Sequence, residues 1–392
     1  MKNKKLHYSL TADSWDNKEL LAINKVVKSN RFTMGKNVKK FENNFSKYIG
    51  SNYSVMVNSG SSANLLMVAA LFYSKKFNLK RGDEIIVPSV SWSTTYFPLA
   101  QYGLKIVFVD IDLNTLNLNH ELIEKAITKK TKAIFAVNLL GNSCNYDEIK
   151  KISRKHSLYL IEDNCESLGS KYKNKYTGTF GIMGSFSFFF SHHLQTIEGG
   201  MIVTNDLNLY EILVSLRAHG WTRDLPEINT IQNKKLDKFY DSFNFVLPGY
   251  NLRPGELNGA IGIEQLKKIK FFMKMRRLNA IFFKELFAND KNILIQSETG
   301  TSSWFGFSII LINKLANKRD DVIKFLELNN IETRPIVAGN FTKNPVIQYL
   351  DYRISGKLTN ADISDKQGFF IGNDHRNLRE ELSLLRSILD KF

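Results

Sequence analysis

Short runs of β-forming residues alternate with helical patterns between residues 54 and 204, and this alternation restricts the fold more than any other feature of the chain. Most of these runs are rich in Val, Ile, Leu or Phe, and most are separated by about one helix-length. Strands joined by single helices favour a mainly parallel sheet with helices on both faces. We expect strands at 54–57, 84–88, 106–110, 133–137, 158–163, 185–190 and 201–204.

The pattern changes after the Gly- and Pro-rich segment 248–256, where a long helical pattern begins and continues to about Leu286. Beyond it, the sequence favours strands near 305–311 and 333–337, and a terminal helix from Asn377. These elements are sufficient for a second, smaller α/β unit.

The length of 392 residues and the hydrophobic content of 43% are sufficient for two packed domains. We expect a large domain over residues 1–250, on which the segment 1–50 packs, and a smaller C-terminal α/β domain over 251–392. No apolar run reaches the roughly 20 residues of a membrane-spanning helix, and no apolar signal region follows the charged start of the chain. The sequence therefore predicts a cytoplasmic protein with no membrane partner.

A formal net charge of +16, from 54 basic and 38 acidic residues, suits an anionic partner such as a nucleotide-bearing molecule. The lysines are scattered and no basic–aromatic motif is present, so we predict no nucleic-acid partner. Two cysteines are too few for a four-cysteine zinc site or a cysteine-ligated iron–sulfur cluster. No metal site is predicted.

Polar residues follow several of the expected strands, at the sheet edge where open α/β proteins bind ligands. Gly60 and Ser61 precede an apolar helical run, where backbone N–H groups can hold a phosphate, although an ordinary capped helix explains them equally well. Trp92 offers a flat ring for stacking, but a hydrophobic core would also suit it. Asp163 and Glu166 follow a buried strand, where a carboxylate needs a cationic partner such as a protonated pyridine nitrogen.

Two further segments carry reactive or polar side chains. Ser187, His192 and His193 follow a strongly apolar strand, and adjacent histidines in an extended segment point to opposite faces. One histidine is therefore expected to face the site and the other to face away. Asn251 and Arg253 lie in the turn that opens the long helical pattern, where turn and capping roles are the alternative explanation.

Together, the phosphate loop, aromatic ring, buried Asp and post-strand base resemble the sugar aminotransferase family of fold-type I pyridoxal-phosphate enzymes, which act on nucleotide-linked keto sugars. The resemblance extends from about Phe32 to Arg334. It implies an α/β fold like that of aspartate aminotransferase, with a large, mainly parallel sheet between helices and a smaller C-terminal domain. It also implies a homodimer with shared active sites.

The resemblance implies a role for each matched residue. Gly60, Ser61 and Ser187 are expected to bind the cofactor phosphate, Trp92 to stack on the ring, and Asp163 to pair with the ring nitrogen.

Other matched residues are expected around these. Glu166 is implied beside the ring oxygen, and Asn251 is implied to reach the phosphate of the neighbouring subunit. His219, Arg223 and Arg334 are the residues expected to bind the substrate.

The chain departs from the family at the residue that normally binds the cofactor covalently. The family lysine lies five residues after the Ser of its SF motif and six before the Glu of its EGG motif, and both counts lead to His192 here. No lysine occurs between Lys175 and Lys234. Imidazole can exchange protons near neutral pH but forms no stable covalent bond with the cofactor aldehyde.

This substitution resembles the 3-dehydratase branch of the family. It implies pyridoxal 5'-phosphate and pyridoxamine 5'-phosphate as untethered cofactor forms, with His192 as the proton carrier. It implies L-glutamate as amino donor and a nucleotide-linked 4-keto-6-deoxy sugar, most closely a GDP-sugar, as the substrate that loses its 3-hydroxyl.

Three other functions stay open at this point. A nucleotide-sugar aminotransferase that uses another lysine would retain the nitrogen in its product. A catalytically inactive family member would bind sugar or cofactor without turnover. A nucleic-acid binder is suggested by the net charge alone.

Overall fold

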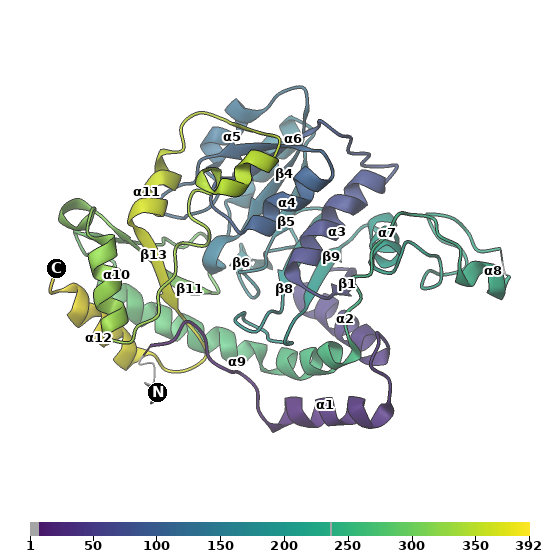
Figure 1. Ribbon diagram of the computed structural model, residues 1–392, viewed down its shortest axis with the longest axis horizontal. Coiled ribbons are helices and arrows are strands. Elements are labelled where there is room, and N and C mark those ends of the chain that lie inside the picture. The colour runs from purple at the N-terminus through teal and green to yellow at the C-terminus, as the bar shows by residue number, and fades with distance from the viewer. Residues whose placement is uncertain (1–7, 236) are drawn as a thin grey trace.

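The computed structural model describes residues 8–235 and 237–392. Its centre is an eight-stranded sheet in the order β1, β9, β8, β5, β4, β2, β3, β12 (Figure 1). Every neighbouring pair is parallel except the two that involve β9. The strands are β1 (Tyr53–Val57), β2 (Glu84–Pro88), β3 (Lys105–Val109), β4 (Thr131–Val137), β5 (Tyr159–Asp163), β8 (Met183–Ser187), β9 (Gly200–Thr204) and β12 (Tyr352–Ile354).

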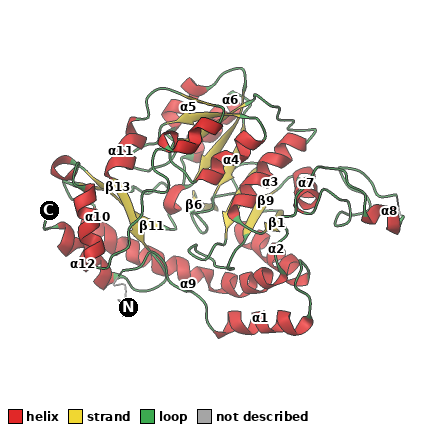
Figure 2. Cartoon of the chain, viewed as in Figure 1, coloured by secondary structure: helices red, strands yellow, loops and turns green. Residues whose placement is uncertain are grey.

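Helices cover both faces of this sheet, because successive strand residues point to opposite sides. Val87 and Phe135 pack towards α3, α4 and α7, whereas Ile86 and Ile134 pack towards α5 and α6. On that second side, α2 and α9 cover the end of the sheet formed by β1, β8 and β9 (Figure 2). The helices are α2 (Lys36–Ile49), α3 (Gly60–Tyr73), α4 (Ser93–Gln101), α5 (His120–Ala126), α6 (Tyr146–Lys155), α7 (Leu207–Arg217) and α9 (Glu256–Phe287).

A second core surrounds a three-stranded antiparallel sheet, β10-β11-β13. The long helix α9 connects the two cores: its first half packs on α2, and Phe283 and Phe287 near its end lie in the second core. The other elements of this core are β10 (Ile293–Ile295), β11 (Gly306–Leu311), β13 (Gly368–Gly372), α10 (Arg319–Leu328) and α12 (Arg379–Leu389).

The remaining elements lie around these two cores. α1 packs along α9, and α8 lies in a segment that projects from the body of the molecule, at the right in Figure 1. No helix within the described ranges is long and apolar enough to span a bilayer. These elements are α1 (Asn17–Ser29), α8 (Lys238–Ser242), α11 (Thr359–Gln367), β6 (Lys171–Tyr172), β7 (Lys175–Tyr176) and 3-10 turns at Leu139–Gly141, Asn313–Leu315, Phe341–Lys343 and Pro345–Tyr349.

The structure confirms the predicted fold class and corrects two of the expected strands. The strand expected at 185–190 ends at Ser187, and the chain then turns, with the His192 N–H donating to the carbonyl of Phe189. The strand expected at 333–337 does not form. Pro335 has no N–H to donate, and Val337 has a φ of 52°, which no strand accommodates.

The C-terminal half of the chain contributes to both sheets. β12 lies within residues 251–392 but pairs with β3 at the edge of the large sheet. β10, β12 and β13 were not expected from the sequence, because each is short or lies next to a helix without a clear alternation. The division into domains at residue 250 stays a prediction.

Candidate active site

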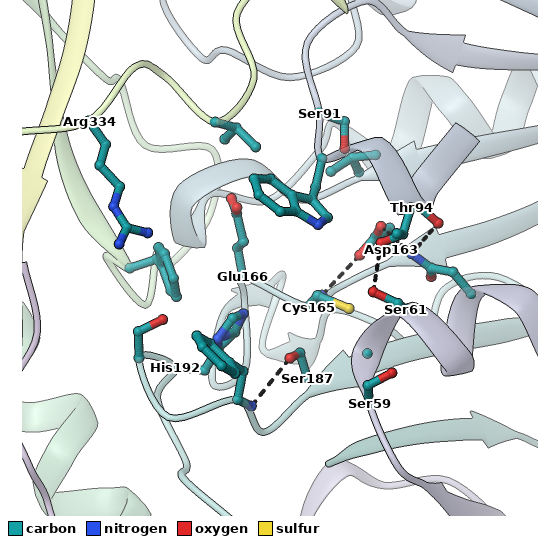
Figure 3. A pocket seen from close by; sticks show the side chains of 18 of the residues that line it. Ser59, Ser61, Ser91, Thr94, Asp163, Cys165, Glu166, Ser187, His192 and Arg334 are labelled. Atoms are coloured by element: carbon teal, nitrogen blue, oxygen red, sulfur yellow. Dashed lines mark hydrogen bonds between the residues drawn. The ribbon is translucent and has the colours of Figure 1, made fainter. Parts of the chain in front are cut away.

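A cavity of about 300 Å³ lies at the carboxyl edge of the large sheet, beside the ends of β5 and β8 and the starts of α3 and α4. This is the edge at which open α/β sheets bind ligands. Residues far apart in the sequence meet there (Figure 3). Most of the residues singled out in the sequence line the cavity: Gly60, Ser61, Trp92, Asp163, Glu166, Ser187, His192 and Arg334.

One end of the cavity is formed by hydroxyl groups at the start of α3. The Ser61 hydroxyl donates to Thr94 Oγ1 at 3.0 Å, and Ser187 lies across from Gly60. A Cβ added at Gly60 would come within 2.6 Å of the Ser187 Cβ, so only glycine permits this close approach. Free N–H groups of a helix start together with hydroxyl groups make a site for an anion.

The carboxylate of Asp163 lies at the base of the cavity and is only 5% exposed. Its Oδ2 accepts hydrogen bonds from Asn64 Nδ2 at 2.7 Å and Thr95 Oγ1 at 2.8 Å, and its Oδ1 accepts one from the Cys165 N–H at 3.1 Å. It forms no ion pair with any residue that the structure describes. A buried carboxylate held in this way is suited to a cationic group of a ligand.

Glu166 presents a second carboxyl group to the same cavity. Burial, and secondarily repulsion by Asp163, raise the pKa of Glu166 to about 7, while the hydrogen bond from the Leu140 N–H at 2.9 Å opposes this. This carboxyl group therefore exchanges a proton near neutral pH.

His192 lies on the cavity wall, and His193 is not among the residues that line the cavity. The His192 ring packs edge-on against Phe305, with ring centroids 5.1 Å apart, and its Nδ1 has no hydrogen-bond partner among the described residues. Burial, and then the positive charge of Arg276, lower the pKa of His192 to about 3. Its imidazole is therefore neutral at neutral pH.

Trp92 caps the start of α4 and is 57% exposed, so a face of its ring is available to a ligand. Arg334 lies on the opposite side of the cavity from Ser61 and Thr94 (Figure 3). None of the residues lining the cavity is a lysine. Nowhere in the described parts of the chain do His, Cys, Asp and Glu residues form a group that could hold a metal ion.

Three of the predicted residues lie outside this cavity. Asn251 is exposed, and its Oδ1 accepts a hydrogen bond from Arg253 Nε at 3.0 Å. His219 and Arg223 both pack on Trp221, with the His219 ring centroid at 5.0 Å and the Arg223 guanidinium at 3.8 Å from the indole. These residues form a separate cluster within one chain.

Other residues at the cavity were not found from the sequence. Asn64 and Thr95 hold Asp163, and the Ser185 hydroxyl in turn donates to Asn64 Oδ1 at 2.6 Å. A buried Asn in the otherwise apolar pattern of α3 was the available signal. Phe305 and Phe370 reach the cavity from the C-terminal half of the chain, and no local pattern marked them.

Comparison with known proteins assigns the chain to one enzyme family. The model of the DegT/DnrJ/EryC1/StrS aminotransferase family matches residues 13–381. The chain is 55% identical to the GDP-4-keto-6-deoxy-D-mannose 3-dehydratase of Yersinia pseudotuberculosis, over 100% of both chains. It is similar to a solved structure of the E. coli GDP-4-keto-6-deoxy-D-mannose-3-dehydratase with bound hydrated PLP, with a TM-score of 0.96 and 53% identity over 98% of this chain and 99% of that one.

A second solved structure, of GDP-4-keto-6-deoxymannose-3-dehydratase with a trapped PLP-glutamate geminal diamine, also has a TM-score of 0.96 and 53% identity, over 98% of this chain and 100% of that one. The family model matches almost the whole chain, and the alignment with the Yersinia enzyme covers all of it. The chain therefore belongs to the DegT/DnrJ/EryC1/StrS aminotransferase family.

Proposed function

We propose that this chain is a pyridoxal-phosphate-dependent enzyme that removes the 3-hydroxyl group of GDP-4-keto-6-deoxy-D-mannose, with L-glutamate as amino donor. The observation that carries the proposal is that His192 lines the cavity and that none of the lining residues is a lysine, the residue that normally binds the cofactor in this family. Full-length similarity to 3-dehydratases that carry this activity in their names supports the substrate.

The residues of the cavity fit the cofactor. Gly60, Ser61 and Ser187 form the end suited to its phosphate, and the Asp163 carboxylate is suited to its protonated ring nitrogen. The exposed face of Trp92 is available to stack on its ring. When bound, the cofactor supplies a group that exchanges an amine and a ring that accepts electrons during elimination.

His192 is the proposed proton carrier in both halves of the reaction. The Nδ1 of its imidazole has no hydrogen-bond partner among the described residues, so it can accept the proton of glutamate's α-carbon and deliver it elsewhere. In the second half it can pass a proton to the departing 3-hydroxyl group. Asp163 would keep a proton on the ring nitrogen, and Glu166 would lie beside the ring oxygen.

The absence of a lysine explains why the reaction would end in dehydration. Without a side-chain amine, the cofactor stays untethered and no residue displaces the product amine from it. The sugar's C3–O bond is replaced by a C3–H bond, which is a reduction, and the electron pair comes from glutamate, which becomes 2-oxoglutarate. Its nitrogen leaves as ammonia, and the sugar product is a 4-keto-3,6-dideoxy sugar.

Asn251 is proposed to act in the site of a neighbouring subunit. In its own chain it is exposed and does not line the cavity. A two-fold dimer would place two such residues in equivalent positions, each facing the partner's phosphate end. His219 and Arg223 share Trp221 with Arg253, the hydrogen-bond partner of Asn251, and are proposed to bind the substrate from the same side as Asn251. Arg334 is proposed to bind it from within the chain.

The first prediction concerns the product. Purified protein with pyridoxal phosphate, L-glutamate and GDP-4-keto-6-deoxy-D-mannose should release ammonia and a sugar nucleotide that has lost one oxygen atom. Mass spectrometry of the sugar nucleotide and an ammonia assay measure both. A product that retains nitrogen would identify an aminotransferase, and no turnover of glutamate would identify an inactive family member.

The second prediction separates the two adjacent histidines. His192→Asn should reduce both half-reactions by about 10²–10⁴-fold, which is the usual contribution of a general acid–base group. His193→Asn, as the matched control, should have a much smaller effect, because that side chain does not line the cavity. Stopped-flow absorbance of the bound cofactor after adding glutamate measures the first half-reaction. The reverse order of effects would overturn the assignment of His192.

The third prediction tests whether Asn251 acts across a dimer. Loss of a hydrogen bond to a charged phosphate should cost about 1.5–3 kcal/mol, so Asn251→Ala should weaken cofactor binding roughly tenfold to a hundredfold. Mixed dimers of Asn251→Ala and His192→Asn subunits, at limiting cofactor, should recover one active site, because one site then combines intact His192 with the partner's intact Asn251. Failure to recover activity would show that Asn251 acts within its own chain.

A further inference from the structure

Arg276 is a buried cation in α9, directly behind the cavity wall. It is 5% exposed, and its Nη1 donates to the carbonyl oxygens of Trp304 at 3.3 Å, Phe305 at 3.1 Å and also Asn373. It makes no ion pair with a carboxylate within the described ranges, and its Nε has no hydrogen-bond partner there. A buried charge bound to neutral carbonyl groups is costly, so a role in stability alone explains it poorly.

The peptide that Arg276 binds is part of the cavity wall. The Phe305 ring lines the cavity and contacts both histidines, with centroids 5.1 Å from His192 and 5.5 Å from His193. The Phe305 N–H donates to the carbonyl of Leu140 at 3.0 Å, and the Leu140 N–H donates to Glu166 Oε2. Arg276 therefore fixes the segment that connects His192 with Glu166.

The charge of Arg276 also acts on these histidines. Burial lowers the pKa of Arg276 to about 10, which leaves it charged at neutral pH. After burial itself, Arg276 is the cause that lowers the pKa of His192, and it is also the first charged group acting on His193.

The other charged groups near these histidines are accounted for. Asp163, Glu166, Glu198 and Arg334 line the same cavity as His192. Behind the wall, Asp374 is paired with Arg376 at 2.7 Å, and it also raises the pKa of Arg276. Arg277, the next residue of α9, acts on His193.

We propose that Arg276 is a positioning residue of this active site: it fixes the Phe305 wall against His192 and places a positive charge directly behind that wall. It does not touch the cavity itself. The consequence for catalysis rests on the proposed function, whereas the effect on His192 can be measured without cofactor or substrate.

The fourth prediction is a titration of His192 by NMR of imidazole-labelled, cofactor-free protein, with His192→Asn identifying the signal. In the unaltered protein, His192 should stay neutral down to roughly pH 5. Arg276→Gln keeps a hydrogen-bond donor but removes the charge, so the titration midpoint should rise measurably towards the usual 6.5. Arg277→Gln removes an equal charge from the same helix and should leave the midpoint unchanged. An unchanged midpoint in Arg276→Gln would overturn the proposal.

Arg276→Lys tests the geometric part and remains informative if Arg276→Gln does not fold. The lysine keeps the charge but loses the guanidinium fork, so the midpoint of His192 should stay while kcat/KM falls about tenfold at every pH. A kcat/KM equal to that of the unaltered enzyme would overturn the positioning role. A fall in kcat/KM together with a raised midpoint would contradict the assignment of the charge effect to Arg276.

Discussion

The carboxylate of Asp163 is the interaction around which the active site is arranged. It is buried at the end of β5, and three donors from α3, α4 and its own loop hold it in one orientation. Those donors leave its negative charge uncompensated by any described residue, so the site is suited to a cation that a ligand brings. Because Asn64 is fixed in turn by Ser185, the strand ends, the helix starts and the carboxylate form one connected polar network.

Against this family framework, the side chain at position 192 determines which reaction the site would carry out. A lysine would bind the cofactor covalently and displace product amines from it, whereas a neutral imidazole can only move protons. The structure adds a physical reason for that neutrality: the imidazole is buried against Phe305, and the charge of Arg276 lies behind that wall. In the proposed function, the residue at this one position and its electrostatic surroundings decide between amine transfer and dehydration.

Much of the fold and of the cavity could be predicted from the sequence, because strand alternation is local and the residues that follow parallel strands meet at one edge. Asn64 stands out as a polar residue in the apolar pattern of α3, but its partner Asp163 is 99 residues away, so no local pattern identifies the contact between them. Phe305 and Arg276 come from the C-terminal half, whose packing depends on the tertiary fold. The strand expected at 333–337 does not form, because Pro335 lacks an N–H to donate and Val337 adopts a left-handed backbone conformation.

The central claim, that His192 leaves the cofactor without a covalent bond to the chain, is tested most directly by borohydride reduction of the cofactor-loaded protein followed by intact mass measurement. His192→Lys provides the positive control and should gain the mass of one reduced pyridoxyl phosphate at residue 192. The account predicts that the unaltered chain keeps its mass and releases all cofactor on denaturation. A stoichiometric mass increase on one lysine of the unaltered chain would contradict it.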